Sequence, residues 1–314
     1  MSLPANPDPL VVVVVVNYEG LEDTVACVES LLAQDYPARN VVVVDNGSRI
    51  DEALAIRARF GRAVHAIRSH TNGGYGAGAN VGIRWALAER ADYVWVLNND
   101  TLVQPSTLRR LVESLERDPE IGIASPQIRA PEGPDAPHGV WYAGGVVSLE
   151  RGQTRHHTDP LPDSPVPVDT GFITGCAPFI RRAVLETVGL FWEPLFLFWE
   201  DTDLCLRAQA AGWRTCVIPS AWIFHRVHGS TSDATVARYH YRNALLVVRR
   251  NGTTRQVVLA IASTGMLMAR LWAAAALRRR PWPTAATAGF LSGLRSLVRR
   301  EARRLPVPVT RRRP

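Results

Sequence analysis

Residues 94–101 read VWVLNNDT, an apolar run that ends abruptly in two asparagines and an aspartate. The run predicts a buried strand, and its polar end places Asp100 where that strand stops. Ligands of open α/β sheets bind outside the carboxyl ends of the strands, and a carboxylate there suits Mg²⁺ or Mn²⁺, which can hold a diphosphate. Taken alone, the stretch is better explained by a strand and an Asx turn in which Asp100 caps the next helix. The rest of the chain reverses that judgement.

The first hundred residues repeat this arrangement of an apolar run with a polar end. Strand patterns at 10–16, 41–44, 64–67 and 93–97 alternate with helix patterns that begin near Asp23 or Thr24, at 51 and at 79. Asn17 and Glu19, Asp45 and Asp100 follow three of these strands. Because the carboxyl ends of parallel strands meet at one edge, the repetition predicts a nucleotide site along that edge. The predicted fold is α/β, with a Rossmann-like, mostly parallel sheet flanked by helices.

A glycine-rich stretch, NGGYGAGAN at 72–80, lies between the third and fourth predicted strands. Its four glycines allow close approach of the backbone to a ligand, and the predicted helix at 79–91 could face a phosphate. The spacing is not GxGxxG, so a turn without a ligand explains the stretch equally well.

A cluster of aromatic residues at 190–199 ends in the acids Glu200, Asp201 and Asp203. Desolvation by aromatic rings raises a carboxylate pKa and suits the group to act as a base. The alternative is that the acids occupy the first turn of a helix, where the dipole favours them. His225 follows an apolar strand pattern, where a satisfied edge residue is commoner than a metal ligand.

Residues 126–167 contain eight prolines and predict loops, with a hairpin near 140–149, that form the lip of a substrate site. The pair His156 and His157 in this stretch is better explained by a solvated loop than by a metal site. The four cysteines form no CxxC pair and are predicted to be small buried hydrophobes. The amino-terminal residues do not match a signal peptide, so a cytoplasmic location is expected.

The basic residues are all arginines, and 11 of the 36 fall within residues 278–314, against the single acid Glu301. The apolar stretch 256–277 is interrupted by Arg270 and is predicted to fall short of a membrane span. Residues 291–300 place leucines and arginines at helical spacing, as in an interfacial helix. We favour a peripheral membrane surface, on the inner face of the plasma membrane, over a helix docked on the catalytic body.

Seven motifs occur in an order that resembles a known family: VVVVNYEG, VVVVDNGS, NGGYGAGAN, LNNDT, TGFITGC, FWEDTDLCLRA and IFHRVHG. Together they resemble the inverting glycosyltransferase family 2, which has the GT-A fold, and are most similar to its rhamnosyltransferase-like branch. The resemblance covers about residues 10–250. It implies a catalytic domain at 1–250, with a nucleotide-binding half at 10–125 and an acceptor half at 126–250. Residues 251–314 would form a helical, arginine-rich membrane-surface or docking region with amphipathic helices.

The resemblance implies contacts with the nucleotide-sugar from strand ends and from the glycine-rich stretch: Asn17, Glu19, Asp45, Asn72, Gly73, Asn80, Asn98 and Asn99. Asp45 would bind the pyrimidine base. Asp100 would bind the divalent metal, Mn²⁺ or Mg²⁺, with His225 completing the shell and His228 as the alternative. Asp201 would be the general base, and Glu200 beside it would shape the acceptor site. The metal motif is Asn-Asn-Asp, with a single carboxylate, so tight metal binding would need oxygens from the donor diphosphate.

The expected activity is therefore inverting transfer of rhamnose or a hexose from a dTDP- or UDP-sugar to a glycan or polyprenyl-linked acceptor. A soluble transferase acting on a small natural product is the nearest rival. A non-catalytic nucleotide or nucleic-acid binding module is a rival of another class, supported by the basic tail. We expect no nucleic-acid partner, because a nucleic-acid site would gain nothing from three clustered acids. A dehydrogenase is disfavoured because the chain lacks GxGxxG.

Overall fold

The computed structural model describes residues 8–227, 233–278 and 283–298. A central sheet has the strand order β10-β12-β6-β11-β4-β1-β2-β3, with β5 paired to β12 and β7 paired to β6. Its strands are β1 Val11–Asn17, β2 Arg39–Asp45, β3 His65–Arg68, β4 Tyr93–Asn98, β5 Thr101–Val103, β6 Ile121–Arg129, β7 Val140–Tyr142, β10 Val168–Asp169, β11 Phe179–Arg181 and β12 Arg214–His225. The pairs β1–β2, β1–β4, β2–β3 and β6–β12 are parallel, and β11 runs antiparallel between β4 and β6. The predicted α/β class with a mostly parallel sheet is confirmed.

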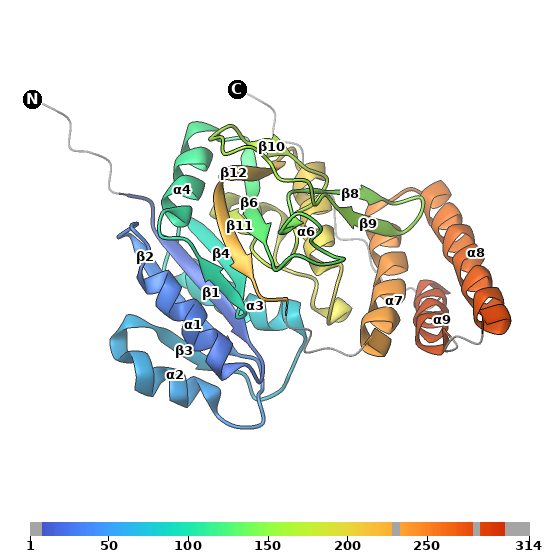
Figure 1. The fold of residues 1–314 in the computed structure, drawn as a ribbon, viewed down its shortest axis with the longest axis horizontal. Helices are drawn as coiled ribbons and strands as arrows, with labels where there is room; N and C mark the ends of the chain where they lie inside the picture. Colours follow the sequence, from blue (N-terminus) through green and yellow to red (C-terminus); the bar gives the residue numbers. More distant parts are fainter. Residues whose placement is uncertain (1–7, 228–232, 279–282, 299–314) are drawn as a thin grey trace, which may run out of the picture.

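Helices cover both faces of this sheet, with α1, α2 and α4 on one side and α3 and α6 on the other (Figure 1). The helices are α1 Leu21–Leu32, α2 Glu52–Phe60, α3 Tyr75–Ala88, α4 Thr107–Arg117, α5 Arg182–Val188, α6 Glu200–Ala210, α7 Asp233–Asn251, α8 Thr254–Arg278 and α9 Thr284–Val298. Short 3-10 helices occupy Gly61–Ala63 and Glu193–Leu195. The crossover helices explain why β1 reads as continuous valine: both of its faces are covered.

Helix α3 approaches strand β1 closely. Gly82 lies directly over Val14, and a Cβ atom at Gly82 would overlap the Val14 methyl groups. Only glycine lets the helix axis come this near, so this residue sets the distance between α3 and the sheet.

Three element boundaries differ from the sequence prediction. Helix α1 begins at Leu21 after Gly20, without a side-chain cap, because the Thr24 hydroxyl donates to Asn17 instead. Helix α3 begins at Tyr75, not at 79, so part of the glycine-rich stretch is helical. The hairpin consists of β8 Gly145–Ser148 and β9 Gln153–His156, farther along than 140–149, because Val140–Tyr142 pairs with β6. All four cysteines are free and buried, as predicted.

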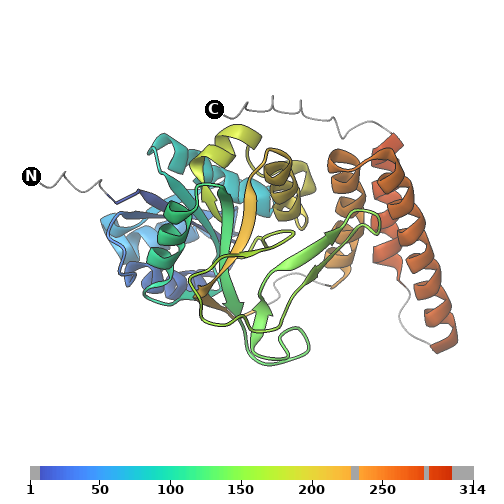
Figure 2. The same cartoon turned by 90° about the horizontal axis from the view of Figure 1, so that it is seen from above.

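The three C-terminal helices α7, α8 and α9 lie together beside the sheet, and the β8–β9 hairpin reaches them (Figures 1 and 2). A Cβ atom at Gly152 in that hairpin would lie 3.6 Å from Ala244 and 3.7 Å from Ala260. In the part of the chain that the structure describes, one helix, Thr254–Leu277, is long and apolar enough to cross a membrane by length and composition. The prediction that this stretch falls short is wrong on that criterion, because Arg270 does not interrupt the helix.

Candidate active site

The polar residues that end neighbouring strands meet at one edge of the sheet. In the β1–β2 register Asn17 lies beside Asp45, and in the β1–β4 register Val16 lies beside Asn98. The predicted convergence of the first, second and fourth strand ends is therefore what the structure shows.

The side-chain amides of Asn17 and Asn99 form hydrogen bonds with other groups of the protein. Asn17 is fully buried, donates to the Glu52 carboxylate at 2.7 Å and accepts from the Thr24 hydroxyl at 2.8 Å. Asn99 donates to Asn17 Oδ1 at 3.3 Å and to the Gly20 carbonyl at 3.1 Å. These contacts hold the β1–α1 and β4–β5 turns against each other, and Glu52 is the buried partner that the motif analysis did not identify.

Asp45 presents a buried oxygen at the same edge. Its Oδ1 accepts the Ser48 amide at 3.0 Å, whereas Oδ2 has no hydrogen-bond partner among the described residues and lies 3.8 Å from Arg68 Nε. Glu19 stands nearby with a positive φ of 51° and forms a 2.8 Å ion pair with exposed Arg49. A buried carboxylate oxygen without a donor is suited to accept a hydrogen bond from a ligand.

The glycine-rich stretch is built around Gly74, which has φ of +89° and presses on the backbone of Phe196. A Cβ atom at Gly74 would overlap the Phe196 carbonyl. Asn72 and Gly73 are exposed in the turn before α3, and Asn72 Oδ1 accepts the Gly74 amide at 2.8 Å. Glycine is required here by both the backbone angle and the contact.

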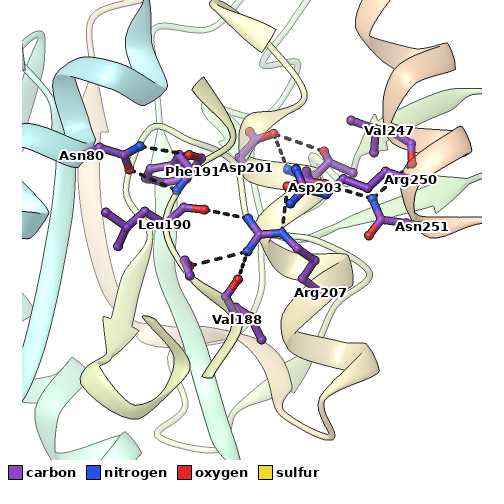
Figure 3. A network of polar contacts seen from close by, with 12 residues as sticks. Asn80, Val188, Leu190, Phe191, Asp201, Asp203, Arg207, Val247, Arg250 and Asn251 are labelled. Atoms are coloured by element: carbon purple, nitrogen blue, oxygen red, sulfur yellow. Dashed lines mark hydrogen bonds and ion pairs between the residues drawn. The ribbon is translucent and has the colours of Figure 1, made fainter. Parts of the chain in front are cut away.

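Asn80 lies one and a half turns into α3 and points at the segment after α5 (Figure 3). Its amide donates to the Phe191 carbonyl and to Glu193 Oε1, both at 2.9 Å, and its oxygen accepts the Phe191 amide at 3.0 Å. All the polar groups of this side chain are therefore engaged by the protein, which fixes the aromatic segment to the glycine-rich helix.

Asp100 and His225 form a close pair, with 3.0 Å between Asp100 Oδ1 and His225 Nε2. Both side chains are almost buried, and His225 Nδ1 has no hydrogen-bond partner among the described residues. Burial favours the neutral imidazole, but the neighbouring Cys176 and Asp100 outweigh it and raise the pKa of His225 to about 10. The ring of Trp141 packs edge-on at 4.8 Å between centroids and shields the pair.

This pair fits one side of a divalent-metal site. The Asp100 carboxylate supplies the oxygen ligand that Mn²⁺ and Mg²⁺ prefer, and His225 can add a nitrogen once it has released its proton; its Nδ1 has no hydrogen-bond partner among the described residues. The described part of the chain holds no group of three or more His, Cys, Asp or Glu side chains arranged for a metal. Further ligands would have to come from a bound diphosphate. His228 lies outside the described residues.

Residues 174–176 connect the Asp100 pair to Asp201. The Asn98 amide donates to the Cys176 carbonyl at 3.0 Å, and the Gly175 amide donates to Asp201 Oδ2 at 2.7 Å. The hydroxyl of Tyr75 donates to the Gly175 carbonyl, so Tyr75 stands between the two acids. The motif analysis gave Tyr75 no role, although an aromatic residue among four glycines was a signal.

Burial governs the ionisation of the neighbouring acids. It raises the pKa of Asp201 despite hydrogen bonds from Gly175 and Thr202, and burial together with the Asp201 charge raises the pKa of Glu200. Glu200 Oε2 is buried and, among the described residues, has no partner. Burial away from water raises the proton affinity of both carboxylates, which suits one of them to accept a proton from a substrate.

Asp203, the third acid of the cluster, has a different role (Figure 3). It is fully buried and bonds Arg207 Nε at 2.8 Å, Asn251 Nδ2 at 3.0 Å and Arg250 Nε at 3.5 Å. Arg250 also lies over the Trp192 ring, 4.4 Å from its centroid. Asp203 therefore joins α6 to α7 and does not face a substrate, so the acids of the cluster do not act as one group.

The chain matches the model of "Glycosyltransferase like family 2" over residues 7–244 of its 314. It belongs to this family, whose members transfer a sugar from a nucleotide sugar. The predicted family assignment is confirmed.

Two curated relatives show the kind of enzyme that the chain is similar to. An N-acetylglucosaminyl-diphospho-decaprenol L-rhamnosyltransferase of Mycobacterium tuberculosis is 29% identical over 247 residues, covering 70% of this chain and 78% of the relative. A dTDP-rhamnosyl transferase, RfbF of Shigella flexneri, is 25% identical over 244 residues, covering 73% and 79%.

Among solved structures, the mannosyltransferase PcManGT of Pyrobaculum calidifontis, in complex with GDP-Man and Mn²⁺, is similar with a TM-score of 0.57. The match has 18% identity and covers 92% of this chain and 87% of the other. At that identity the similarity shows the fold alone, and the predicted GT-A fold is confirmed.

Replacement of Asp203 by Ala should destabilise the protein by about 3–5 kcal/mol, because Arg207 and Arg250 would be left buried without their counter-charge. Urea unfolding measures the loss. Glu113→Ala is the matched control, since Glu113 forms an exposed ion pair with Arg117 and its loss should cost less than about 1 kcal/mol. Equal effects of the two substitutions would contradict the assignment of Asp203.

Proposed function

We propose that this family 2 enzyme transfers rhamnose or a hexose, with inversion, from a dTDP- or UDP-sugar to a hydroxyl of a glycan or polyprenyl-linked acceptor. The observation that carries the proposal is that residues 174–176 bond both the Asn98 amide, two residues before Asp100, and Asp201, while His225 neighbours Asp100 and Cys176. A group for the leaving diphosphate and a group for the acceptor proton would then lie near one segment. The two rhamnosyltransferase relatives support the choice of sugar, and the dTDP-rhamnosyl transferase supports the pyrimidine nucleotide.

The nucleotide would bind over the ends of β1 and β2. Oδ2 of Asp45, which accepts no hydrogen bond from the described residues, would accept the ring N–H of a uracil or thymine base. Glu19, Asn72 and Gly73 border this position from exposed turns and would contact the sugar-phosphate part. Asn17, Asn80 and Asn99 would act indirectly, by holding these turns in place.

Asp100 and His225 would hold the divalent metal, Mn²⁺ or Mg²⁺, with Asn98 beside them at the end of β4. A metal bound there would neutralise the departing diphosphate as a Lewis acid. With a single carboxylate, the two side chains alone form an incomplete shell, so metal and nucleotide should bind together.

Asp201 would accept the proton of the acceptor hydroxyl. The Gly175 amide holds Oδ2 of its carboxylate, and the amide and hydroxyl of Thr202 hold Oδ1, so the protein fixes the position of this group. The acceptor oxygen then attacks the anomeric carbon from the side opposite the diphosphate, and this single displacement inverts the configuration. Glu200, buried beside Asp201, disfavours a second negative charge and would shape the acceptor pocket.

A membrane surface is the proposed location of the acceptor. Val258, Met266 and Leu277 of α8 are exposed, and the arginine-rich sequence follows this helix. Apolar side chains beside arginines suit the boundary between acyl chains and anionic headgroups, on the inner face of the plasma membrane.

A thermal-shift panel of UDP, dTDP, GDP and NAD, each with Mn²⁺ or with a chelator, tests the donor class. UDP or dTDP should raise the Tm only with metal, because the diphosphate completes the metal shell and binding to the folded state adds stability. Asp100→Asn should abolish this shift. If no pyrimidine diphosphate shifts the wild-type protein with any metal, the proposal fails, and salt-dependent RNA binding would favour the binding module instead.

Asp201→Asn should lower kcat about 10²–10⁴-fold while leaving nucleotide affinity unchanged. The base must be ionised to act, and burial raises the pKa of Asp201 in the folded state. As pH is lowered, wild-type kcat should therefore begin to fall at a pH above the ordinary aspartate range of about 4. As pH rises, the carboxyl ionises first in the unfolded chain, so its ionisation costs stability up to the raised folded-state pKa. Asp201→Asn, which cannot ionise, should therefore be no less stable than wild type at neutral pH. An acid limb near pH 4 in the kcat profile of the wild-type enzyme would contradict the assignment of Asp201 as base.

Replacement of the seven arginines between residues 299 and 313 by Gln tests the membrane surface without removing α9. Wild-type protein should sediment with phosphatidylglycerol vesicles and much less with phosphatidylcholine vesicles, and the variant should lose the difference. Equal sedimentation of both proteins would remove this part of the proposal. Turnover on a water-soluble acceptor, unaffected by vesicles, would favour the natural-product transferase.

A further inference from the structure

The segment immediately before the two site acids is held in an unfavourable backbone conformation. Phe196, Phe198 and Trp199 have φ of 66°, 67° and 73°, in the left-handed region that residues with a Cβ atom rarely adopt. Glu200 and Asp201 follow directly as the first residues of α6. A strained segment of this kind persists only where its surroundings hold it.

Most of those surroundings belong to α7, outside the sheet. The amino group of the buried Asn243 side chain lies 2.8, 2.8 and 2.9 Å from the carbonyl oxygens of Leu195, Leu197 and Phe198, which share its two hydrogens. The remaining carbonyl of this run, that of Phe196, accepts the Tyr75 amide at 2.8 Å. The Asn243 side chain and the Tyr75 amide thus bind four successive carbonyls, of which that of Leu195 also accepts the Leu197 amide at 2.8 Å.

The apolar contacts of residues 195–199 are also made mainly with α7. Leu195 and Trp199 form a small buried cluster with Ala244, Leu246 and Val247 of α7, separate from the main core. The Phe196 ring stacks on Tyr239 of the same helix, with centroids 5.1 Å apart. The placement of residues 195–199 therefore depends on α7 more than on the sheet.

We propose that Asn243 is a positioning residue for the transfer reaction: from α7 it holds residues 195–199 and thereby sets the place of Asp201. The inference rests on the proposed role of Asp201 as base. Asn243 itself is fully buried and bonded to the backbone of the segment, so it acts only through that segment. Glycine would relieve the strain at these positions, but the chain has bulky aromatics there, which makes the support from α7 necessary.

The test compares Asn243→Asp and Asn243→Ala with Asn251→Ala. Asp keeps the shape of Asn but replaces the donating amino group with an oxygen, and Ala removes the group entirely. Asn251 is the matched control because its amide also joins α7 to α6, through Asp203, without touching residues 195–199. All proteins are full length and are measured below the lowest Tm of the set.

Two measurements are needed, one of them independent of activity. Hydrogen exchange of the peptide containing Gly175, whose amide donates to Asp201, should be at least about tenfold faster in the Asn243 variants and unchanged in Asn251→Ala. In transfer assays kcat should fall about 10- to 100-fold, while KM for the donor and affinity for UDP or dTDP with Mn²⁺ stay within about threefold.

Wild-type kcat in a folded Asn243→Asp variant would overturn the proposal, as would an equal loss in Asn251→Ala. Failure of both Asn243 variants to fold would also overturn it, since the residue would then support the whole helix. If the wild-type protein transfers no sugar and binds no nucleotide, the proposed function fails instead. The exchange of the Gly175 peptide still decides, in that case, whether Asn243 places Asp201.

Discussion

The Asp203 carboxylate is fully buried between Arg207 of its own helix and Arg250 of α7, and this contact holds α6 against the first of the C-terminal helices. A buried charge that loses its partner is strongly unfavourable. Separation of α6 from α7 would take Arg250 away from Asp203, so the ion pair opposes it. Because α6 begins with Glu200 and Asp201, the same contact connects the site acids to the C-terminal helices. The helices after residue 233 are therefore part of the support of the active site.

The alternation of strands and helices in the first hundred residues, and the edge at which the polar strand ends meet, followed from the sequence. The valine runs of β1 and β2 are buried on both faces, and Asn17, Asp45 and Asn98 end adjacent strands as their spacing predicted. These features depend on local pattern and on the parallel arrangement, which residues near in the sequence determine. The start of α3 at Tyr75 was missed because glycines usually argue against a helix, whereas here a Cβ atom at Gly78 would lie only 2.9 Å from Asn46 and 3.1 Å from Val16.

The sequence could not predict in the same way which side chains are free to bind a ligand and which bond other parts of the protein. Asn80 and Asn99 match family positions at the nucleotide, yet their amides bond Phe191 and Gly20, partners 111 and 79 residues away. Asp203 stands two residues after Asp201, but its partner Arg250 comes from α7. Such roles depend on contacts between distant segments, which no local spacing encodes. The pairing of Asp100 with His225 was found only because the family resemblance named both residues.

The contact between Gly74 and Phe196 joins the glycine-rich turn to the segment that precedes Glu200 and Asp201. Under the proposed function, a substitution that moves either turn would affect both the nucleotide and the acceptor. In evolutionary terms the two turns would then not be separable modules. Chimeras that join the halves of two relatives would have to keep residues 72–75 and 195–199 from the same parent.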